Sequence, residues 1–214
     1  MTVDSHAPSL RDTFVRQLGD DLAAFVDRHE GIYATVGDID EDLWSSRAED
    51  LIFTNGKQTA TQFGRLIYSQ LSDRAAGPVE SRFRPDFLDP WVHEVSENVG
   101  KAMVAGMIAD LAVNNEPESM FDRFRTSATL MAVSLTTSFA NLGAHDGARA
   151  AGGRFKTWRT NSGNPRSSHA SVAGETVELG QSFSNGLRWP GDRSGGDIEE
   201  TAGCQCSLSF TGGR

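Results

Sequence analysis

Apolar side chains recur every three or four positions over much of the chain, which is the spacing of one face of an amphipathic α-helix. The spacing is regular in four stretches. Together they predict about four helices whose apolar stripes form a shared core. The approximate bounds of these stretches are residues 10–29, 57–71, 89–113 and 119–142.

Residues near the ends of these stretches carry signals for starting and stopping a helix. Ser9 is placed to cap the first helix, and Gly31 is placed to end it. Asp89 followed by Pro90 predicts the start of the third helix, because a proline at the first helical position loses no hydrogen bond. The polar motif NNEP, at residues 114–117, predicts the end of that helix.

Two intervening segments show weaker patterns. Residues 32–55 contain the acidic run DIDEDLW, which fits either a short helix or a surface loop. Around Gly77 and Pro78 the chain is polar, which predicts a connector between the second and third helices.

The pattern changes after the fourth stretch. Glycines between residues 143 and 153 interrupt the helical period, and short runs typical of β-strands follow, separated by turn-rich loops. Residues 181–203 have no regular pattern, and so long a loop is usually functional or held by something other than an apolar core. We therefore expect an α+β fold, with an acidic helical region over residues 1–150 and a small β-rich domain over residues 151–214.

The charge is distributed unevenly between these two parts. The chain has 214 residues and a net charge of −9. Seven basic and six acidic residues fall within residues 152–214, so nearly all the negative charge lies on the helical part. This balance argues against a protein that contacts nucleic acid with its whole surface.

Neither a targeting peptide nor a membrane segment is expected. The first residues lack a basic region leading into an apolar run, and the most apolar stretches are too short for a bilayer. The two cysteines are too few for a disulfide framework, and with one residue between them they would pair only with strain. We expect a protein made in a reducing cytoplasm and without membrane contact.

The motifs at the C-terminal end occur in an informative order. "KTWRT" is followed by a turn, by "PRSSHASVAGETVEL", by a phenylalanine, by "WPGD" and finally by "GCQCSL". This order resembles the C-terminal domain of the phage Mu F-like minor head proteins, which combine an aromatic strand, a polar motif with Arg and His or with two Cys, a Gly-led strand, a Pro-containing loop and a closing Cys-x-Cys. The resemblance covers about the last 60 residues, and the helical part matches in character only.

The resemblance implies a minor capsid, or head morphogenesis, protein of a tailed phage or prophage. Such a protein would be made in the host cytoplasm and lie in the virion, in the capsid interior or at the portal vertex. It would bind the portal protein or the major capsid protein and assist head assembly or genome packaging and delivery. Packaged DNA would be a further neighbour.

The same motifs suggest a metal site. His169 and the thiolates of Cys204 and Cys206 would supply three ligands for zinc. Asp192 or a water molecule would complete the set. The resemblance also implies more Cys and a second His in many relatives. In this chain Arg166 and His169 stand at the positions of the first Cys pair, and Ala202 stands where the second His would be.

A small domain without metal is the alternative. His169 would then hydrogen-bond the backbone of the closing strand, and Arg166 would pair with Glu175 or Asp192. The two cysteines are two residues apart, so they would lie on one face of a strand as small core residues.

A basic segment with an aromatic residue within it suggests contact with nucleic acid. Its cations would face phosphates while its ring stacks on a base. A solvated strand face has the same composition, so this interpretation also stays open. The candidate contact residues are Arg154, Lys156, Trp158, Arg159 and Arg166.

An enzyme is the remaining alternative. In a nuclease or toxin-like protein, His169 would act as a base and Arg166 as a phosphate clamp. The sequence contains no H-E-x-x-H motif, P-loop, nucleophile-elbow motif or cluster of carboxylates. We therefore expect a binding protein that is not an enzyme.

Overall fold

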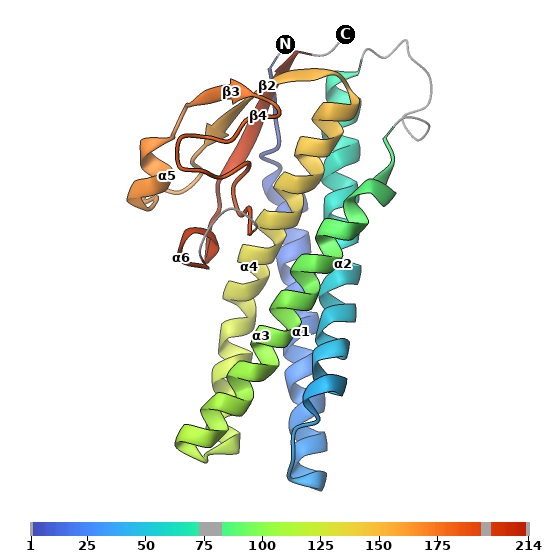
Figure 1. Cartoon of the computed structure of the whole chain (residues 1–214), viewed down its shortest axis with the longest axis vertical. Helices are drawn as coiled ribbons and strands as arrows, with labels where there is room; N and C mark the ends of the chain where they lie inside the picture. The colour runs from blue at the N-terminus through green and yellow to red at the C-terminus, as the bar shows by residue number, and fades with distance from the viewer. Residues whose placement is uncertain (1, 73–82, 194–197, 213–214) are drawn as a thin grey trace.

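The computed structural model describes residues 2–72, 83–193 and 198–212 and has an α+β fold (Figure 1). Four long helices run side by side, and a small antiparallel sheet lies against one end of them. The helices are α1 (Pro8–Val36), α2 (Glu41–Leu71), α3 (Asp89–Asn114) and α4 (Pro117–Ala150). The shorter elements are β1 (Thr2–Asp4), η2 (Pro85–Leu88), β2 (Gly153–Arg159), α5 (Ser167–Ser171), β3 (Thr176–Glu178), α6 (Ile198–Thr201) and β4 (Ser207–Gly212).

The first two helices are longer than the apolar pattern predicted. Gly31 lies inside α1, and the helix ends instead at Gly37, whose φ of 71° is favourable for glycine. Ala7, and not Ser9, precedes the first helical turn. A glycine within a helix costs only about 1 kcal/mol, which the buried stripe of α1 offsets.

The acidic run after α1 starts the second helix. The Asp40 carboxylate accepts a hydrogen bond of 3.0 Å from the backbone N–H of Leu43, as an N-cap does. Glu41 and Asp42 then occupy the first turn, where negative charge complements the helix dipole. The run is therefore helical from Glu41 onward, as the first turn of a long helix and not as the short helix that was one of the two alternatives.

The third helix has the predicted limits but a different cap. Asp89 is its first residue, and Asn115, with a φ of 50°, ends it within the NNEP motif. The Asp89 side chain does not cap the helix, because it accepts a bond of 2.8 Å from the Lys57 ammonium group. The predicted connector at Gly77 and Pro78 lies outside the described residues.

The fourth helix continues through two of the glycines that were expected to interrupt it. A Cβ atom at Gly143 would overlap the carbonyl oxygen of Ala60, and one at Gly147 would overlap that of Gly64. The two glycines therefore let α4 lie directly against the backbone of α2. Gly143 and Gly147 allow close packing between two helices, and neither of them ends α4.

The sheet joins both ends of the chain. Its strand order is β1-β4-β2-β3, and Val3 of β1 pairs with Phe210 of the antiparallel β4. Residues 2–4, which the sequence pattern placed in the helical region, therefore belong to the sheet. One apolar core extends from the helices into the sheet domain.

The described part of the irregular stretch 181–203 is held by an apolar core, contrary to expectation. Phe183, Leu187 and Trp189 have exposed fractions of 2%, 1% and 3%. Trp158 of β2 lies among them, with its ring 5.1 Å from that of Phe183. Large apolar anchors separated by polar residues fix this loop without regular secondary structure.

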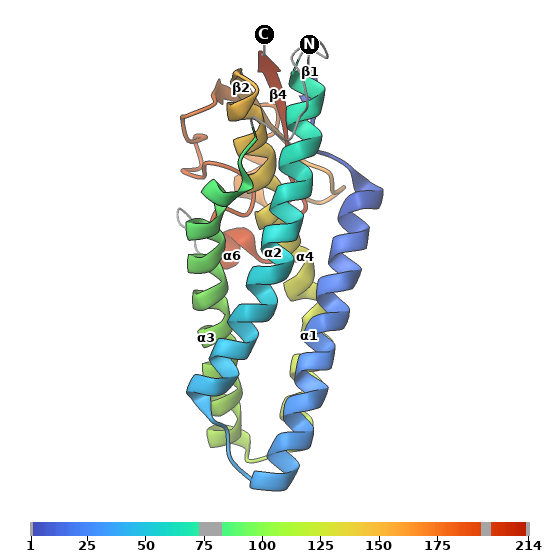
Figure 2. The ribbon, with the colours of Figure 1, turned by 90° about the vertical axis from the view of Figure 1, so that its right-hand side faces the viewer.

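Figure 2 shows α2 between α1 and α3 when the molecule is turned by 90°. In the parts of the chain that the structure describes, no helix combines the length and the apolar character needed to cross a bilayer.

Candidate metal site

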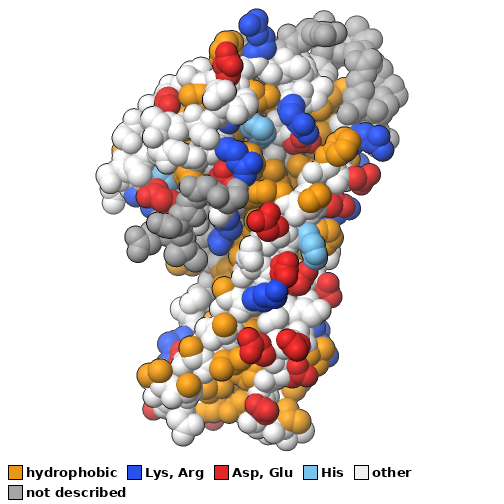
Figure 3. All heavy atoms as spheres, in the orientation of Figure 1, with side chains coloured by type: hydrophobic (Ala, Val, Ile, Leu, Met, Phe, Trp, Pro, Cys, Tyr) orange, Lys and Arg blue, Asp and Glu red, His pale blue; other side chains and the backbone are white. Residues whose placement is uncertain are grey.

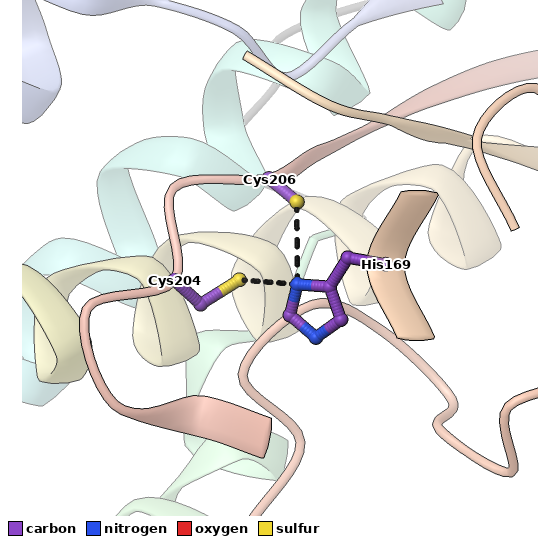
Figure 4. A group of neighbouring side chains, drawn as sticks. All are labelled: His169, Cys204 and Cys206. Carbon is purple, nitrogen blue, oxygen red and sulfur yellow. Dashed lines mark hydrogen bonds between the residues drawn. The ribbon is translucent and has the colours of Figure 1, made fainter. Parts of the chain in front are cut away.

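Three side chains from distant parts of the C-terminal region meet at one point, and we call them the His–Cys–Cys cluster (His169, Cys204 and Cys206). The Nδ1 atom of His169 lies 3.6 Å from each of the two sulfur atoms (Figure 4). All three ligand atoms lie within 4.8 Å of one another, and all three residues are buried. The structure thus brings together the three metal ligands that the sequence suggested.

Local structure explains how the two cysteines face the same way. They lie in an extended segment just before β4, with exposed Gln205 between two buried neighbours. Alternate side chains of extended backbone point to the same side. The one-residue spacing therefore directs both sulfur atoms toward His169, which comes from the short helix α5.

Polar side chains of α4 hold this cysteine segment in place. The Ser134 hydroxyl accepts a bond of 2.7 Å from the Gly203 N–H, and the Thr137 hydroxyl donates one of 2.6 Å to the carbonyl of Cys204. The Asn141 amide donates one of 3.0 Å to the carbonyl of Cys206. These three positions lie on one face of a helix, so α4 carries a polar track on which the segment docks. In the sequence, the sign of this track is the helical spacing of the three polar residues.

Arg166 joins α5 to the same segment. Its guanidinium group donates hydrogen bonds to the backbone carbonyls of Glu200 and Ala202. It does not pair with Glu175 or Asp192, because Glu175 accepts from Ser184 and Asp192 is bound by Arg188. That pairing of Arg166 was therefore predicted wrongly, and a backbone clamp takes its place.

The cluster geometry fits zinc. With Zn–S bonds of about 2.3 Å and Zn–N bonds of about 2.0 Å at tetrahedral angles, nitrogen and sulfur ligands lie roughly 3.5 Å apart. The two observed distances of 3.6 Å match this separation.

The second nitrogen of the imidazole faces a carboxylate. Oε2 of Glu200 lies 3.4 Å from Nε2 of His169, which is within ion-pair range but does not meet hydrogen-bond geometry. The hydroxyl of Ser168 donates a bond of 2.7 Å to the same oxygen. Histidines that bind metal commonly turn their other nitrogen toward a carboxylate, which fixes the ring and raises its basicity.

The two thiols shift each other's pKa in opposite directions. A hydrogen bond from Cys204 lowers the pKa of Cys206 well below its usual value, and neighbouring His169 adds to this shift. The same hydrogen bond, together with burial, raises the pKa of Cys204 well above its usual value. Cys206 is therefore the thiol that ionises more readily, and a thiolate is the form that binds metal ions.

The cluster opens on one side to a cavity of about 310 Å³. Ser162, Asn164 and Arg166 line it together with the three cluster residues. Asp192 is not the fourth ligand, because it is fully buried and bound to Arg188 through bonds of 2.8 and 3.1 Å. The open side leaves room for a water molecule as the fourth ligand.

The candidate residues for nucleic-acid contact do not form a continuous surface. Lys156 and Trp158 have exposed fractions of 1% and 0%, whereas Arg154 and Arg159 are exposed. Lys156 donates a bond of 2.7 Å to the carbonyl of Arg188, and burial lowers its pKa to about 8. The predicted contact of Lys156 and Trp158 with nucleic acid is therefore wrong, because neither side chain reaches the surface.

Comparison of the chain with protein-family models, curated protein sequences and solved structures found no match.

Proposed function

We propose that this chain is a minor head protein of a tailed phage whose C-terminal domain is stabilised by one zinc ion. It acts by binding, docks on the portal protein or the major capsid protein, and assists head assembly or genome delivery. Two features support this. The C-terminal motifs follow the order typical of such proteins, and the polar motif and the closing Cys-x-Cys meet in one cluster with zinc-like geometry.

The observation that carries the zinc proposal is the pair of equal nitrogen–sulfur distances in the cluster. Zinc held by His169, Cys204 and Cys206 would join α5 to the segment that precedes β4. That segment is already docked on the polar track of α4. The ion would therefore fix the sheet domain on the helices and give a rigid surface for docking.

Metal analysis of protein purified without chelator tests the zinc proposal. We expect about one zinc per chain, and cobalt replacing zinc should give the absorption of a thiolate-bound ion. The double variant Cys204→Ser and Cys206→Ser should lose the metal, while His93→Ala, which removes an exposed histidine of α3, should keep it. Clearly less than one zinc per chain in the parent protein would overturn this part of the proposal.

The role in the phage head needs a separate test. Purified particles from a phage or prophage that encodes the chain should contain it at few copies, and the purified protein should bind the portal or major capsid protein of the same phage. Variants of exposed Arg154 and Arg159 would show whether packaged DNA adds to binding. Particles that lack the protein, with no binding to either capsid component, would contradict the proposal.

The cavity beside the cluster favours a second candidate, a metal-dependent nuclease. Zinc with three protein ligands and one open position is the arrangement of catalytic sites, where the metal lowers the pKa of a bound water. His169 would then be a ligand and not the base that the sequence suggested. Incubation of the zinc-loaded protein with RNA and with DNA decides this, because the nuclease requires cleavage that His169→Ala abolishes.

A further inference from the structure

An apolar groove of about 470 Å³ runs between α3 and α4. Ser134 of the polar track lines it, together with Thr201 and Ala202, which lie just before the two cysteines in the chain. Trp91, Val95, Val99 and Met103 form one wall, and Phe124 and Met131 form much of the other. In Figure 3, hydrophobic side chains gather in the recess between the sheet domain and α3.

The helix packing explains why this groove stays open. α2 packs closely on both α3 and α4, whereas α3 and α4 make few contacts with each other. Trp91 to Gly106 spans four turns of α3, which is about 22 Å. The groove is therefore long and narrow, with one helix along each wall.

One end of the groove carries polar groups that lack partners. The Nε of Arg193 and the indole Nε1 of Trp91 are both buried, and neither has a hydrogen-bond partner. Among the described side chains, no ion pair includes Arg193, and burial lowers its pKa. Arg193 is a half-buried cation whose Nε has no partner among the described residues, so an anion placed beside it would be favoured.

The shape of the groove favours a small ligand over a protein surface. Its volume lies in the usual range of about 300–1,000 Å³ for small-molecule sites, which are also mostly apolar with a few polar groups. Polar residues such as Glu94, Asn98 and Ser127 interrupt its lining. Leu130, 58% exposed, is the one large apolar side chain of the lining that is mostly open to solvent among the described residues. A stable protein interface needs about 1,000 Å² or more of buried surface, and the apolar area does not extend that far.

We propose that the groove binds an amphiphile with a single apolar chain and an anionic head group. The chain lies between α3 and α4, and the head group accepts hydrogen bonds from Arg193 and Trp91. A fatty acid and a single-chain phospholipid both offer this chemistry. The inference is independent of the proposed head function and of zinc.

Calorimetric titration with four amphiphiles that share a dodecyl chain, each below its micelle concentration, tests the proposal. Dodecanoate and dodecyl phosphate carry anionic heads, dodecyl maltoside is neutral and dodecyltrimethylammonium is cationic. We expect one site per chain and binding of the anions at least about tenfold tighter than that of the other two. Tighter binding of dodecanoate would indicate a fatty acid, and tighter binding of dodecyl phosphate would indicate a phospholipid.

Two variants assign the site. Arg193→Gln should weaken dodecanoate binding about tenfold and leave dodecyl maltoside unchanged, while Arg28→Gln, at an exposed position of α1, should change neither. Ala102→Phe should fill the groove and abolish binding, and circular dichroism would verify its fold. Absence of binding by either anion, equal binding of all four amphiphiles, or an Arg193→Gln variant that binds like the parent would each overturn the proposal.

Discussion

The helical bundle and the sheet domain are held together in different ways. Close helix contact in the bundle depends on the absence of side chains, since Gly143 and Gly147 of α4 lie against the backbone of α2. The sheet domain depends on specific polar contacts, from the track on α4 to the His–Cys–Cys cluster. One helix, α4, therefore contacts both parts. It packs small residues against α2 and directs polar residues to the cysteine segment.

The largest expected effect comes from breaking the bundle contact. Gly143→Leu would place a side chain where the carbonyl of Ala60 lies, so α2 and α4 would have to separate. We expect a loss of about 3 kcal/mol or more in the free energy of unfolding, measured with urea. Gly31→Ala, at a site in α1 with open space, should instead gain about 0.5–1 kcal/mol. Tolerance of leucine at position 143 would show that the two helices do not touch as closely as described.

The next effect comes from removing Asn141, the last residue of the polar track and the one with the most hydrogen bonds. The amide of Asn141 donates to the carbonyls of Pro190 and Cys206 as well as to Thr137 in its own helix. Asn141→Ala leaves buried carbonyls without partners, so we expect a loss of about 2–3 kcal/mol. Thr126→Ala, which removes an exposed hydroxyl of α4 bonded only within that helix, is the matched control and should cost under about 0.5 kcal/mol. Hydrogen exchange should show the loosening in residues 201–210 and not in α1, and an even response across both regions would contradict the division.

Lys156, which is buried in the sheet domain, should make the free energy of unfolding depend on pH. Its pKa falls from 10.5 to about 8 through burial, so the folded state binds fewer protons than the unfolded state between these values. Stability therefore rises with pH across this window by on the order of 2 kcal/mol. Lys156→Met should remove that rise, which urea unfolding at pH 7.5 and 10 would measure. An unchanged pH dependence in the variant would show that other groups cause it.

The smallest expected effect concerns protons released by zinc. Because the pKa of Cys206 is lowered and that of Cys204 is raised, we expect zinc binding at pH 7 to release about one proton from the two thiols. Calorimetry in buffers of different ionisation enthalpy measures this number. Release of about two protons would show that neither thiol is ionised before the metal binds.

Several features of both regions could be predicted from the sequence alone. The apolar period gave the existence of four helices, and the motifs NNEP and Cys-x-Cys gave the end of α3 and two of the cluster residues. Gly143 and Gly147 were misread because a glycine that ends a helix and one that admits a neighbouring helix look alike in a single segment. Small residues four apart on α2, at Gly56, Ala60 and Gly64, were the missing half of that signal.

By itself, the sequence determined the existence of the four helices, the change to short strands after them and the residue types of the cluster. Helical period and extended alternation arise from contacts between residues close in the chain, so they are visible locally. Only the tertiary structure decided that His169 meets two cysteines more than thirty residues away, that Lys156 and Trp158 are buried, and that a groove remains between α3 and α4. Those outcomes depend on how distant surfaces fit together, and packing between distant residues leaves no period in the sequence.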